Sequence, residues 1–346
     1  YLAQGNVSLV QEALRERTTL MTNAPHLAQP LTFVLPVYGL GGRLFRKWFY
    51  GAGLVAYDLL AGAAGLGKTR FLNNQQTAAA VPGIRCEELA GGVSYWDGQF
   101  DDARLAVTIA RTAAQEGAMV MNHCSVIKLL HENDRVAGAQ IRNEENGEFG
   151  SVRARCTINA TGVWVDAVRQ MDNPDSRPMV APSQGVHMVV DRSFMPGDSA
   201  LLVPKTRDGR VLFMVPWLGK LVLGTTDTPC DDLATERSAF HDEVEFILNE
   251  SARYLEKAPA RADVLSVWVG LRPLVRSDSE SSEDTKALSR EHTVVVGRSG
   301  LVTVTGGNFF TGMAGRIGST PLTLNLVSAT EVQFSMPAGV VCDSIL

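Results

Sequence analysis

Apolar residues recur at helical spacing over two stretches near the start of the chain. Over residues 8–22 they fall on roughly one face of a helix, and Pro25 follows the end of the pattern. Residues 43–61 repeat the same spacing. A third helix is expected to begin after an aspartate cap and to run through Arg104 to about Glu116.

From residue 118 onward the pattern changes to short apolar and β-branched runs, which are typical of strands. Strands are expected at 118–122, 124–130, 135–142 and from Val152 to Ala160, and a helix is expected at 164–171. Beyond residue 175 the strand-like runs have little helix between them, apart from one helix at 240–256. These runs lie at 185–190, 199–203, 210–215, 220–225 and near 264–270, 293–297 and 301–305.

This order of elements predicts an α/β (α+β) protein in which a mainly antiparallel sheet is inserted as a substrate domain. The chain has 346 residues, of which 45% are apolar and 20% are charged, which suits about two globular domains. The formal net charge of −5 and the absence of long charge runs argue against nucleic acid as a partner. No apolar run reaches the roughly 18 residues that a membrane-spanning helix needs.

The cysteines and histidines show no metal-binding spacing. The five cysteines lie far apart without a CxxC pair, a distribution that fits free thiols in a reducing compartment. The six histidines include no HExxH motif. No metal site is therefore expected.

Basic and aromatic residues are interleaved in the segment 43–50. Such a mixture suits a membrane-surface anchor, because cations meet lipid phosphates while aromatic rings lie at the headgroup level. A partly buried helix with solvated cations produces the same pattern. Both interpretations stay open at this point.

Residues 62–69, GAAGLGKT, match the phosphate-binding loop GxxxxGK[ST] in full. In a working loop, a buried strand delivers the glycines to a helix N-terminus, whose N–H groups surround the phosphates. Here the preceding residues have the pattern of a helix, and residues 70–74 make a poor helix start. A nucleotide hydrolase is therefore the less favoured alternative.

Three segments carry residue types suited to catalysis or ligand binding. Residues 158–166, INATGVWVD, place small residues after an apolar strand, where α/β folds bind cofactors closely. His187 lies in SQGVHMVV (183–190), and Arg272 lies among apolar residues in GLRPLV (270–275). A hydrogen-bonded core histidine and an internal ion pair are the plain alternatives for these two side chains.

These segments, in this order, resemble the FAD-dependent glycerol-3-phosphate dehydrogenases. The resemblance covers residues 87–307, and residues 1–86 are similar to the family too. It also rests on GGVSYWDGQFDDARL (91–105), FMVPW (213–217), GTTDT (224–228), LSREH (288–292) and TGG (305–307). Each segment is weak alone, whereas their shared order and spacing make the resemblance specific.

The resemblance implies an FAD/NAD(P)-binding Rossmann-like domain with an inserted antiparallel cap that binds the substrate. It implies oxidation of sn-glycerol 3-phosphate to dihydroxyacetone phosphate, with FAD as cofactor and a quinone as electron acceptor. The expected location is cytoplasmic, with peripheral attachment to the inner-membrane surface, and a homodimer stays open. An oxygen-using glycerol-3-phosphate oxidase is the alternative within the class, because these motifs do not encode the acceptor.

The same resemblance implies domain boundaries. Residues 1–174 would form the remainder of the FAD-binding domain, and 175–275 the substrate-binding cap. Residues 276–312 would return to the FAD-binding domain, and 313–346 would form a divergent tail.

The resemblance also assigns individual residues. His187 matches the histidine that accepts the hydroxyl proton, a task that suits the near-neutral unperturbed pKa of imidazole. Arg272 matches the arginine that holds the substrate, and Tyr1 matches a tyrosine that contacts it. The matches to cofactor-binding positions are Val126 near the adenine, Ala160, Thr161 and Gly162 beside the phosphates, and Gly306 and Gly307 at the flavin.

The chain departs from the family pattern at both ends. It contains no GxGxxG motif, so the βαβ unit that receives the FAD pyrophosphate is expected to be missing, together with an arginine that precedes the tyrosine. Asn308 stands where the family has a lysine, and residues 317–346 lack the family's helical pattern. A truncated relative without activity is therefore a further alternative.

Because the pyrophosphate-binding glycines are absent, we expect this polypeptide alone to bind FAD weakly or not at all. Absorption spectroscopy of the purified chain, after incubation with FAD and gel filtration, measures the flavin that it retains. A stoichiometric amount of bound yellow flavin would contradict this expectation.

Overall fold

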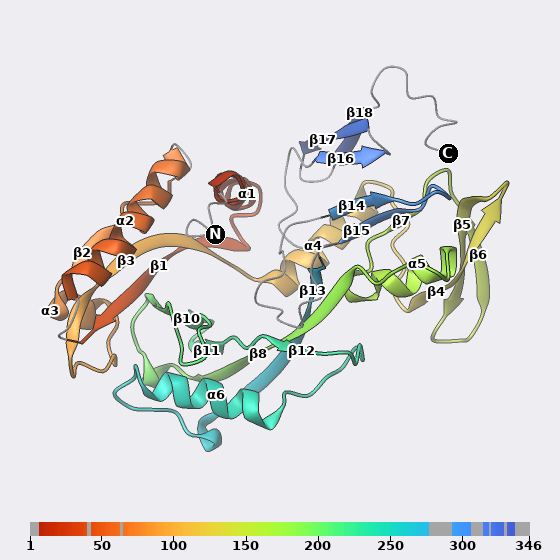
Figure 1. Cartoon of the computed structure of the whole chain (residues 1–346). Helices are drawn as coiled ribbons and strands as arrows, with labels where there is room; N and C mark the ends of the chain where they lie inside the picture. The colour runs from red at the N-terminus through yellow and green to blue at the C-terminus, as the bar shows by residue number, and fades with distance from the viewer. Residues whose placement is uncertain are drawn as a thin grey trace. The chain divides into compact units, whose positions relative to one another are not determined.

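The computed structural model describes residues 7–39, 43–62, 65–276, 293–305, 314–317, 320–328 and 331–335. The chain forms two compact units (Figure 1). Unit 1 consists of Tyr1–Asp101, Gln184–Asp227 and Ala234–Gly270. Unit 2 consists of Asp102–Ser183, Thr228–Leu233 and Leu271–Leu346. The domain boundaries expected at residues 174, 275 and 312 stay predictions.

A long mixed sheet supplies the strands of unit 1, although β12 and parts of β8 and β13 are assigned to unit 2. Its strands follow the order β12-β8-β11-β10-β9-β1-β3-β2, and β13 also pairs with β8. The bounds are β1 Ala28–Tyr38, β2 Arg70–Leu72, β3 Leu89–Phe100, β8 Val180–Asp191, β9 Ala200–Val203, β10 Leu212–Trp217, β11 Lys220–Gly224, β12 Thr228–Pro229 and β13 Ser266–Val275. The β1–β9 pair is parallel, whereas the β8–β11, β11–β10, β10–β9 and β1–β3 pairs are antiparallel.

One face of this sheet packs against α6 (His241–Ala252), which lies beneath β8 and β11 in Figure 1. Side chains alternate between the two faces of a strand, so Val186, Met188 and Val190 of β8 all enter this core. Ile247 of α6 packs into the same cluster and is fully buried, as Met188 is. Alternation along β8 thus leaves His187 on the other face.

The other face of the sheet is covered in part by α1 (Val7–Asn23) and α2 (Arg43–Ala61). β1 sends Val34 into the α6 core and Phe33 into a second cluster, where Phe33 stacks on Tyr95 at 5.5 Å. A polar cluster joins the helices to β3, because Asp97 accepts hydrogen bonds from Arg17 of α1 and Tyr57 of α2. Burial raises the pKa of Tyr57, and the nearby Asp97 charge raises it further.

Two of the three-stranded sheets of unit 2 pack near a short helix. β4 (Cys124–Glu132), β5 (Arg135–Asn143) and β6 (Phe149–Arg153) form an antiparallel meander. The second sheet has the order β14-β15-β7, with bounds β14 Thr293–Val296, β15 Val302–Thr305 and β7 Ile158–Asn159. β15 and β7 are parallel, and α5 (Val165–Asp172) follows β7 through a short 3₁₀ turn at Gly162–Trp164.

Two further segments belong to unit 2. α4 (Asp102–Gln115) is amphipathic, yet none of its residues is buried. Near the C-terminus, β16 (Ala314–Ile317), β17 (Thr320–Ser328) and β18 (Glu331–Ser335) form an antiparallel meander. This region therefore contains no helix over its described residues, in line with the missing helical pattern of residues 317–346.

Most of the expected helices and strands are confirmed, including the α/β class. Two strand predictions are wrong. Residues 118–123 form no ladder, and Met119 is 83% exposed. A strand needs a partner for its backbone groups, and no described strand pairs with this segment. The run from Val152 to Ala160 is divided between β6 and β7, because the two halves pair with different partners, β5 and β15.

The order of elements around the GxxxxGK[ST] segment is the reverse of the order that a phosphate-binding loop requires, which is strand, loop, helix. It follows α2 and precedes β2, so a helix enters it and a strand leaves it. The backbone N–H of Thr69 donates to Asp58, a carboxylate, rather than facing an open anion site. The nucleotide-hydrolase alternative therefore loses its structural basis. In the described part of the chain, no helix is both long enough and apolar enough to cross a membrane.

Leu223 tests the core beneath the sheet, because its side chain is fully buried against the α6 cluster. We expect Leu223→Ala to lower the free energy of unfolding by about 2–5 kcal/mol, through lost burial and a residual cavity. The control is Leu59→Ala on α2, where the side chain is 76% exposed. Urea unfolding followed by circular dichroism measures both variants, and equal midpoints for the two would contradict the packing described.

Candidate functional site

His187 lies half-buried on β8, opposite Gly224 of β11 in the antiparallel register. Its imidazole stacks on the indole of Trp268, with ring centroids 5.4 Å apart and an angle of 14° between the planes. Trp268 belongs to β13, which pairs with β8. Two of the strands that pair with β8, β11 and β13, thus contribute to the position of this ring, and all three residues belong to unit 1.

The residue opposite His187 has to be small. A Cβ atom on Gly224 would lie 2.3 Å from Cδ2 of His187, far closer than a van der Waals contact. The ring therefore occupies the space that a side chain at position 224 would take. This is a close approach that glycine alone permits without displacing the imidazole.

The second group of predicted residues lies in unit 2, at the carboxyl ends of two parallel strands. β7 ends at Asn159, directly before Ala160, and its neighbour β15 ends at Thr305. Gly162 has a φ of +61°, and the space beside its Cα is open to at least 4 Å. Carboxyl ends of parallel strands are where α/β folds bind cofactors.

Hydrogen bonds hold this turn in place. The buried Asn159 donates from Nδ2 to the carbonyl oxygen of Val165 at 2.8 Å and accepts from the hydroxyl of Thr161 at 2.8 Å. Asp166, on α5, accepts from the backbone N–H groups of Met179 and Val180. The turn and the start of α5 are therefore fixed both to each other and to the start of β8.

The remaining predicted residues occupy separate places. Arg272 lies half-buried on β13 in unit 2, whereas His187 belongs to unit 1. Val126 lies on β4, where it pairs with Ile141 and is 37% exposed. Tyr1, Gly306, Gly307 and Asn308 lie outside the described residues. Four residues of the sites went unrecognised from sequence, namely Trp268, Gly224, Asp166 and Asp172.

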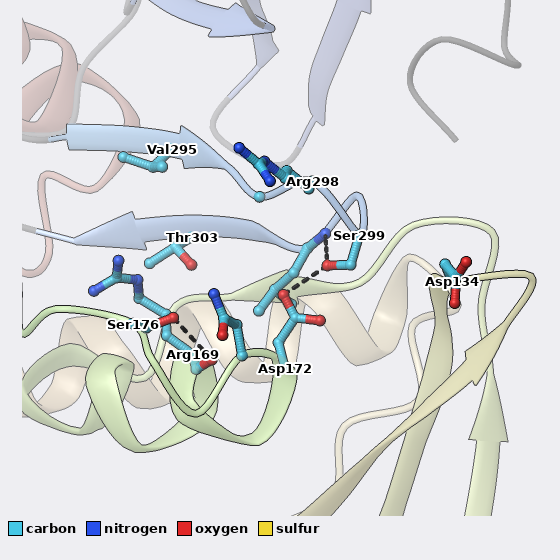
Figure 2. A pocket seen from close by; sticks show the side chains of 11 residues that line it. Asp134, Arg169, Asp172, Ser176, Val295, Arg298, Ser299 and Thr303 are labelled. Atoms are coloured by element: carbon cyan, nitrogen blue, oxygen red, sulfur yellow. Dashed lines mark hydrogen bonds between the residues drawn. The ribbon is translucent and has the colours of Figure 1, made fainter.

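Figure 2 shows a pocket of about 710 Å³ in unit 2, between the end of α5 and the β14–β15 hairpin. The carboxylate of Asp172 accepts from Ser299 Oγ at 2.6 Å and lies 2.9 Å from Nε2 of His131. Asp172 thereby ties α5 to the hairpin and to β4. None of the predicted site residues lines this pocket, whose polar groups include Arg169 and Arg298.

Among the described residues, no three histidine, cysteine, aspartate or glutamate side chains gather in a way that would hold a metal ion. The described cysteines, Cys86, Cys124, Cys156 and Cys230, are all free thiols.

A family model described as FAD dependent oxidoreductase matches residues 1–316 of the chain. The chain belongs to this family. The match includes residues of both units. The expected α/β fold with a flavin cofactor is therefore confirmed at the level of the family.

Several curated relatives of this family member are similar over most of its length. A probable mitochondrial glycerol-3-phosphate dehydrogenase of Caenorhabditis elegans is 42% identical over 307 residues, covering 88% of this chain and 42% of the relative. The human mitochondrial glycerol-3-phosphate dehydrogenase is 40% identical over 315 residues, with the same two coverages. The chain thus spans less than half the length of these two relatives.

Solved structures give the same picture. The glycerol-3-phosphate dehydrogenase from Bacillus halodurans, complexed with FAD, matches with a TM-score of 0.68 and 28% identity over 86% of this chain and 52% of that one. The FAD-bound L-α-glycerophosphate oxidase from Mycoplasma pneumoniae matches with a TM-score of 0.65 and 15% identity, over 88% of this chain and 75% of that one. The second likeness supports the fold alone.

The described residues of this family member fit one side of an FAD site. At the end of β15, the hydroxyl of Thr305 is buried and has no hydrogen-bond partner in the described structure. The open space beside Gly162 lies after the parallel neighbour β7. Unsatisfied buried polar atoms and side-chain-free backbone are features that a bound phosphate or ring system completes. A glycine-rich pyrophosphate loop is absent from the sequence.

Gly224 and Gly270 form a matched test of the His187 position. We expect Gly224→Ala to displace the imidazole from Trp268, because the new methyl group would lie only 2.3 Å from Cδ2 of His187. Gly270→Ala is the control, since open space surrounds its Cα and it lies two residues from Trp268. NMR of ¹⁵N-histidine-labelled protein reports the ring environment. Unchanged His187 resonances in Gly224→Ala would refute this close approach.

Proposed function

We propose that the complete protein oxidises sn-glycerol 3-phosphate to dihydroxyacetone phosphate in an FAD-dependent reaction. The identity of 40–42% to the worm and human mitochondrial glycerol-3-phosphate dehydrogenases supports this substrate. The observation that carries the proposal is the position of His187, which is half-buried, stacked on Trp268 and given room by Gly224. The plain alternative, a histidine enclosed in the apolar core, does not fit a ring on the face opposite that core.

His187 is the proposed proton acceptor. When the carbon that carries the substrate hydroxyl loses a hydride, the hydroxyl proton has to leave for a carbonyl to form. An imidazole nitrogen of His187 accepts that proton, because its unperturbed pKa lies near neutrality. FAD, when bound, supplies the hydride-accepting chemistry. The stacked Trp268 restricts rotation of the ring, which keeps its nitrogen atoms in one orientation.

Arg272 is the proposed substrate anchor. Its guanidinium group presents a planar set of donors that matches phosphate oxygens, and strand β13 carries it at a half-buried position. Tyr1 is proposed as a further substrate contact. The proposed cofactor contacts are Val126 near the adenine, Ala160, Thr161 and Gly162 at the phosphates, and Gly306 and Gly307 at the flavin.

The proposal also covers the electron acceptor and the location. The basic and aromatic segment 43–50 supports work at the surface of an inner membrane, where a quinone accepts the electrons. The worm and human relatives are named as mitochondrial enzymes. Oxygen is the competing acceptor, and a homodimer is the simplest assembly to test. Oxygen consumption against reduction of a soluble quinone distinguishes the two acceptors.

The test of the reaction uses the chain expressed together with whatever coding sequence adjoins it in its gene. Mixed with FAD and sn-glycerol 3-phosphate without oxygen, this protein should lose its oxidised-flavin absorbance. His187→Asn should slow flavin reduction by about 100-fold or more, because a positioned general base contributes on that scale. The matched control is His241→Asn, whose exposed side chain lies on α6 beside Asp242.

The possible outcomes separate the alternatives. A bound flavin that stays oxidised with glycerol 3-phosphate would reject the substrate. Equal rates for wild type and His187→Asn would reject the assigned proton acceptor. Failure to bind flavin at all would favour the alternative of a truncated relative without activity.

A further inference from the structure

The antiparallel ladder between β8 and β11 ends at the pair that holds the proposed proton acceptor. The last rung of the register joins His187 to Gly224. Beyond it, the backbone N–H of Val186 no longer meets a strand partner of β11. Instead it donates to the hydroxyl oxygen of Thr226 at 3.0 Å, inside the protein. A side chain thus satisfies the buried backbone group next to His187.

That hydroxyl is itself held by a buried carboxylate. Thr226 donates from Oγ1 to Oε1 of Glu243 at 2.9 Å. The other oxygen of Glu243 accepts from Nε2 of Gln184 at 2.6 Å and from the backbone N–H of Phe240 at 3.0 Å. Glu243 therefore accepts hydrogen bonds from β8, from the segment after β11 and from the start of α6. Its exposure is 5%, and that of Thr226 is 1%.

The orientation of the amide between these groups is fixed from both sides. Gln184 accepts at Oε1 from Nε of Arg237 at 2.8 Å, and it donates from Nε2 to Glu243. A cation on one side and a carboxylate on the other leave one orientation for a fully buried amide. Arg237, Gln184, Glu243, Thr226 and the N–H of Val186 thus form one continuous chain of hydrogen bonds within unit 1.

We propose that Glu243 is a positioning residue for His187, acting through Gln184 and Thr226. Its two carboxylate oxygens join Gln184, three residues before His187, to Thr226, two residues after the glycine that gives the imidazole room. Gly224 gives the imidazole room and Trp268 stacks on it, but neither residue fixes the backbone of β8 at His187. The Glu243 cluster does so at the open end of the β8–β11 ladder.

This role rests on the proposed function only as far as catalysis is concerned. An imidazole ring at the wrong distance or angle accepts a proton more slowly, and even a small displacement lowers the rate of proton transfer strongly. Substrate binding depends on other groups, Arg272 among them. Loss of the cluster is therefore expected to lower kcat while KM changes little.

Two buried glutamates on α6 provide the matched experiment. Glu243→Gln removes a charged acceptor from the cluster, whereas Glu250→Gln makes the same change one helical heptad later. Glu250 is 2% exposed and pairs with Arg253 at 2.8 Å and with Arg207 at 3.8 Å, neither of which lies on β8. A second pair supports the first, because Thr226→Ser keeps the hydroxyl that Thr226→Val removes. Circular dichroism and thermal unfolding identify any variant that fails to fold.

The first readout is the His187 ring in ¹⁵N-histidine-labelled protein, with its resonances assigned from His187→Asn. We expect shifted or broadened His187 signals in Glu243→Gln and Thr226→Val, and wild-type signals in Glu250→Gln and Thr226→Ser. In the FAD-loaded protein, the first two variants should show a roughly tenfold lower kcat at a nearly unchanged KM. The serine variant should retain wild-type turnover.

The outcomes distinguish this inference from the proposed function. Unchanged His187 signals in both Glu243→Gln and Thr226→Val would overturn the positioning role, as would an equal response to Glu250→Gln. In a further outcome, the His187 signals change in Glu243→Gln and Thr226→Val but not in Glu250→Gln, while glycerol 3-phosphate fails to reduce the flavin of the wild type. In that case the positioning role stands and the proposed substrate is rejected.

Discussion

The register of β8 against β11 is the constraint on which the rest of unit 1 depends. Side chains alternate along a strand, so a slip by one residue would send His187 into the α6 core and Met188 onto the opposite face. The apolar residues at alternate positions 186, 188 and 190 exclude that slip, because all three are fully buried beside α6. The same burial that stabilises the sheet therefore selects the face on which the imidazole lies. Fold and candidate chemistry share one determinant here.

Local patterns predicted helices well and long-range pairing poorly. α2 has the bounds 43–61 that its periodicity indicated, and the bounds of α5 and α6 lie within a few residues of the expected ranges. No element was predicted for β1 or β3, which pair with each other over their whole lengths. β1 contains Pro30 and Pro36, residues that normally argue against an internal strand. At residues 118–122 the error is the opposite one, because a strand was predicted and none forms. A strand-like composition does not provide a pairing partner.

The same division applies to the candidate site. His187 and Arg272 could be chosen from the sequence because their residue types suit proton transfer and anion binding, and a family resemblance strengthened the choice. Trp268 could not, because its role arises only when β13 pairs with β8. Gly224 stood in a quoted motif, yet the reason for a glycine appears only when the cross-strand neighbour is known to be His187. Sequence identifies the reactive groups, and pairing identifies what holds them.

Helix α6 carries two buried carboxylates, and their partners indicate whether each one serves stability or function. A helix that packs under a sheet needs only an apolar stripe, which Val244, Ile247 and Leu248 supply. Burying a carboxylate in addition costs free energy unless good partners offset it. At Glu250 the partners are Arg253, directly after α6, and Arg207, between β9 and β10, so neither lies on β8 or in the segment after β11. At Glu243 the partners come from β8, from the segment after β11 and from the backbone N–H of Phe240, and the first two lie just beyond the His187–Gly224 rung. An apolar residue at position 243 could fill the same volume, but it could not hold Gln184 and Thr226 in a fixed relation. The retained carboxylate therefore suits a requirement for one backbone geometry beside His187 better than it suits a requirement for core stability.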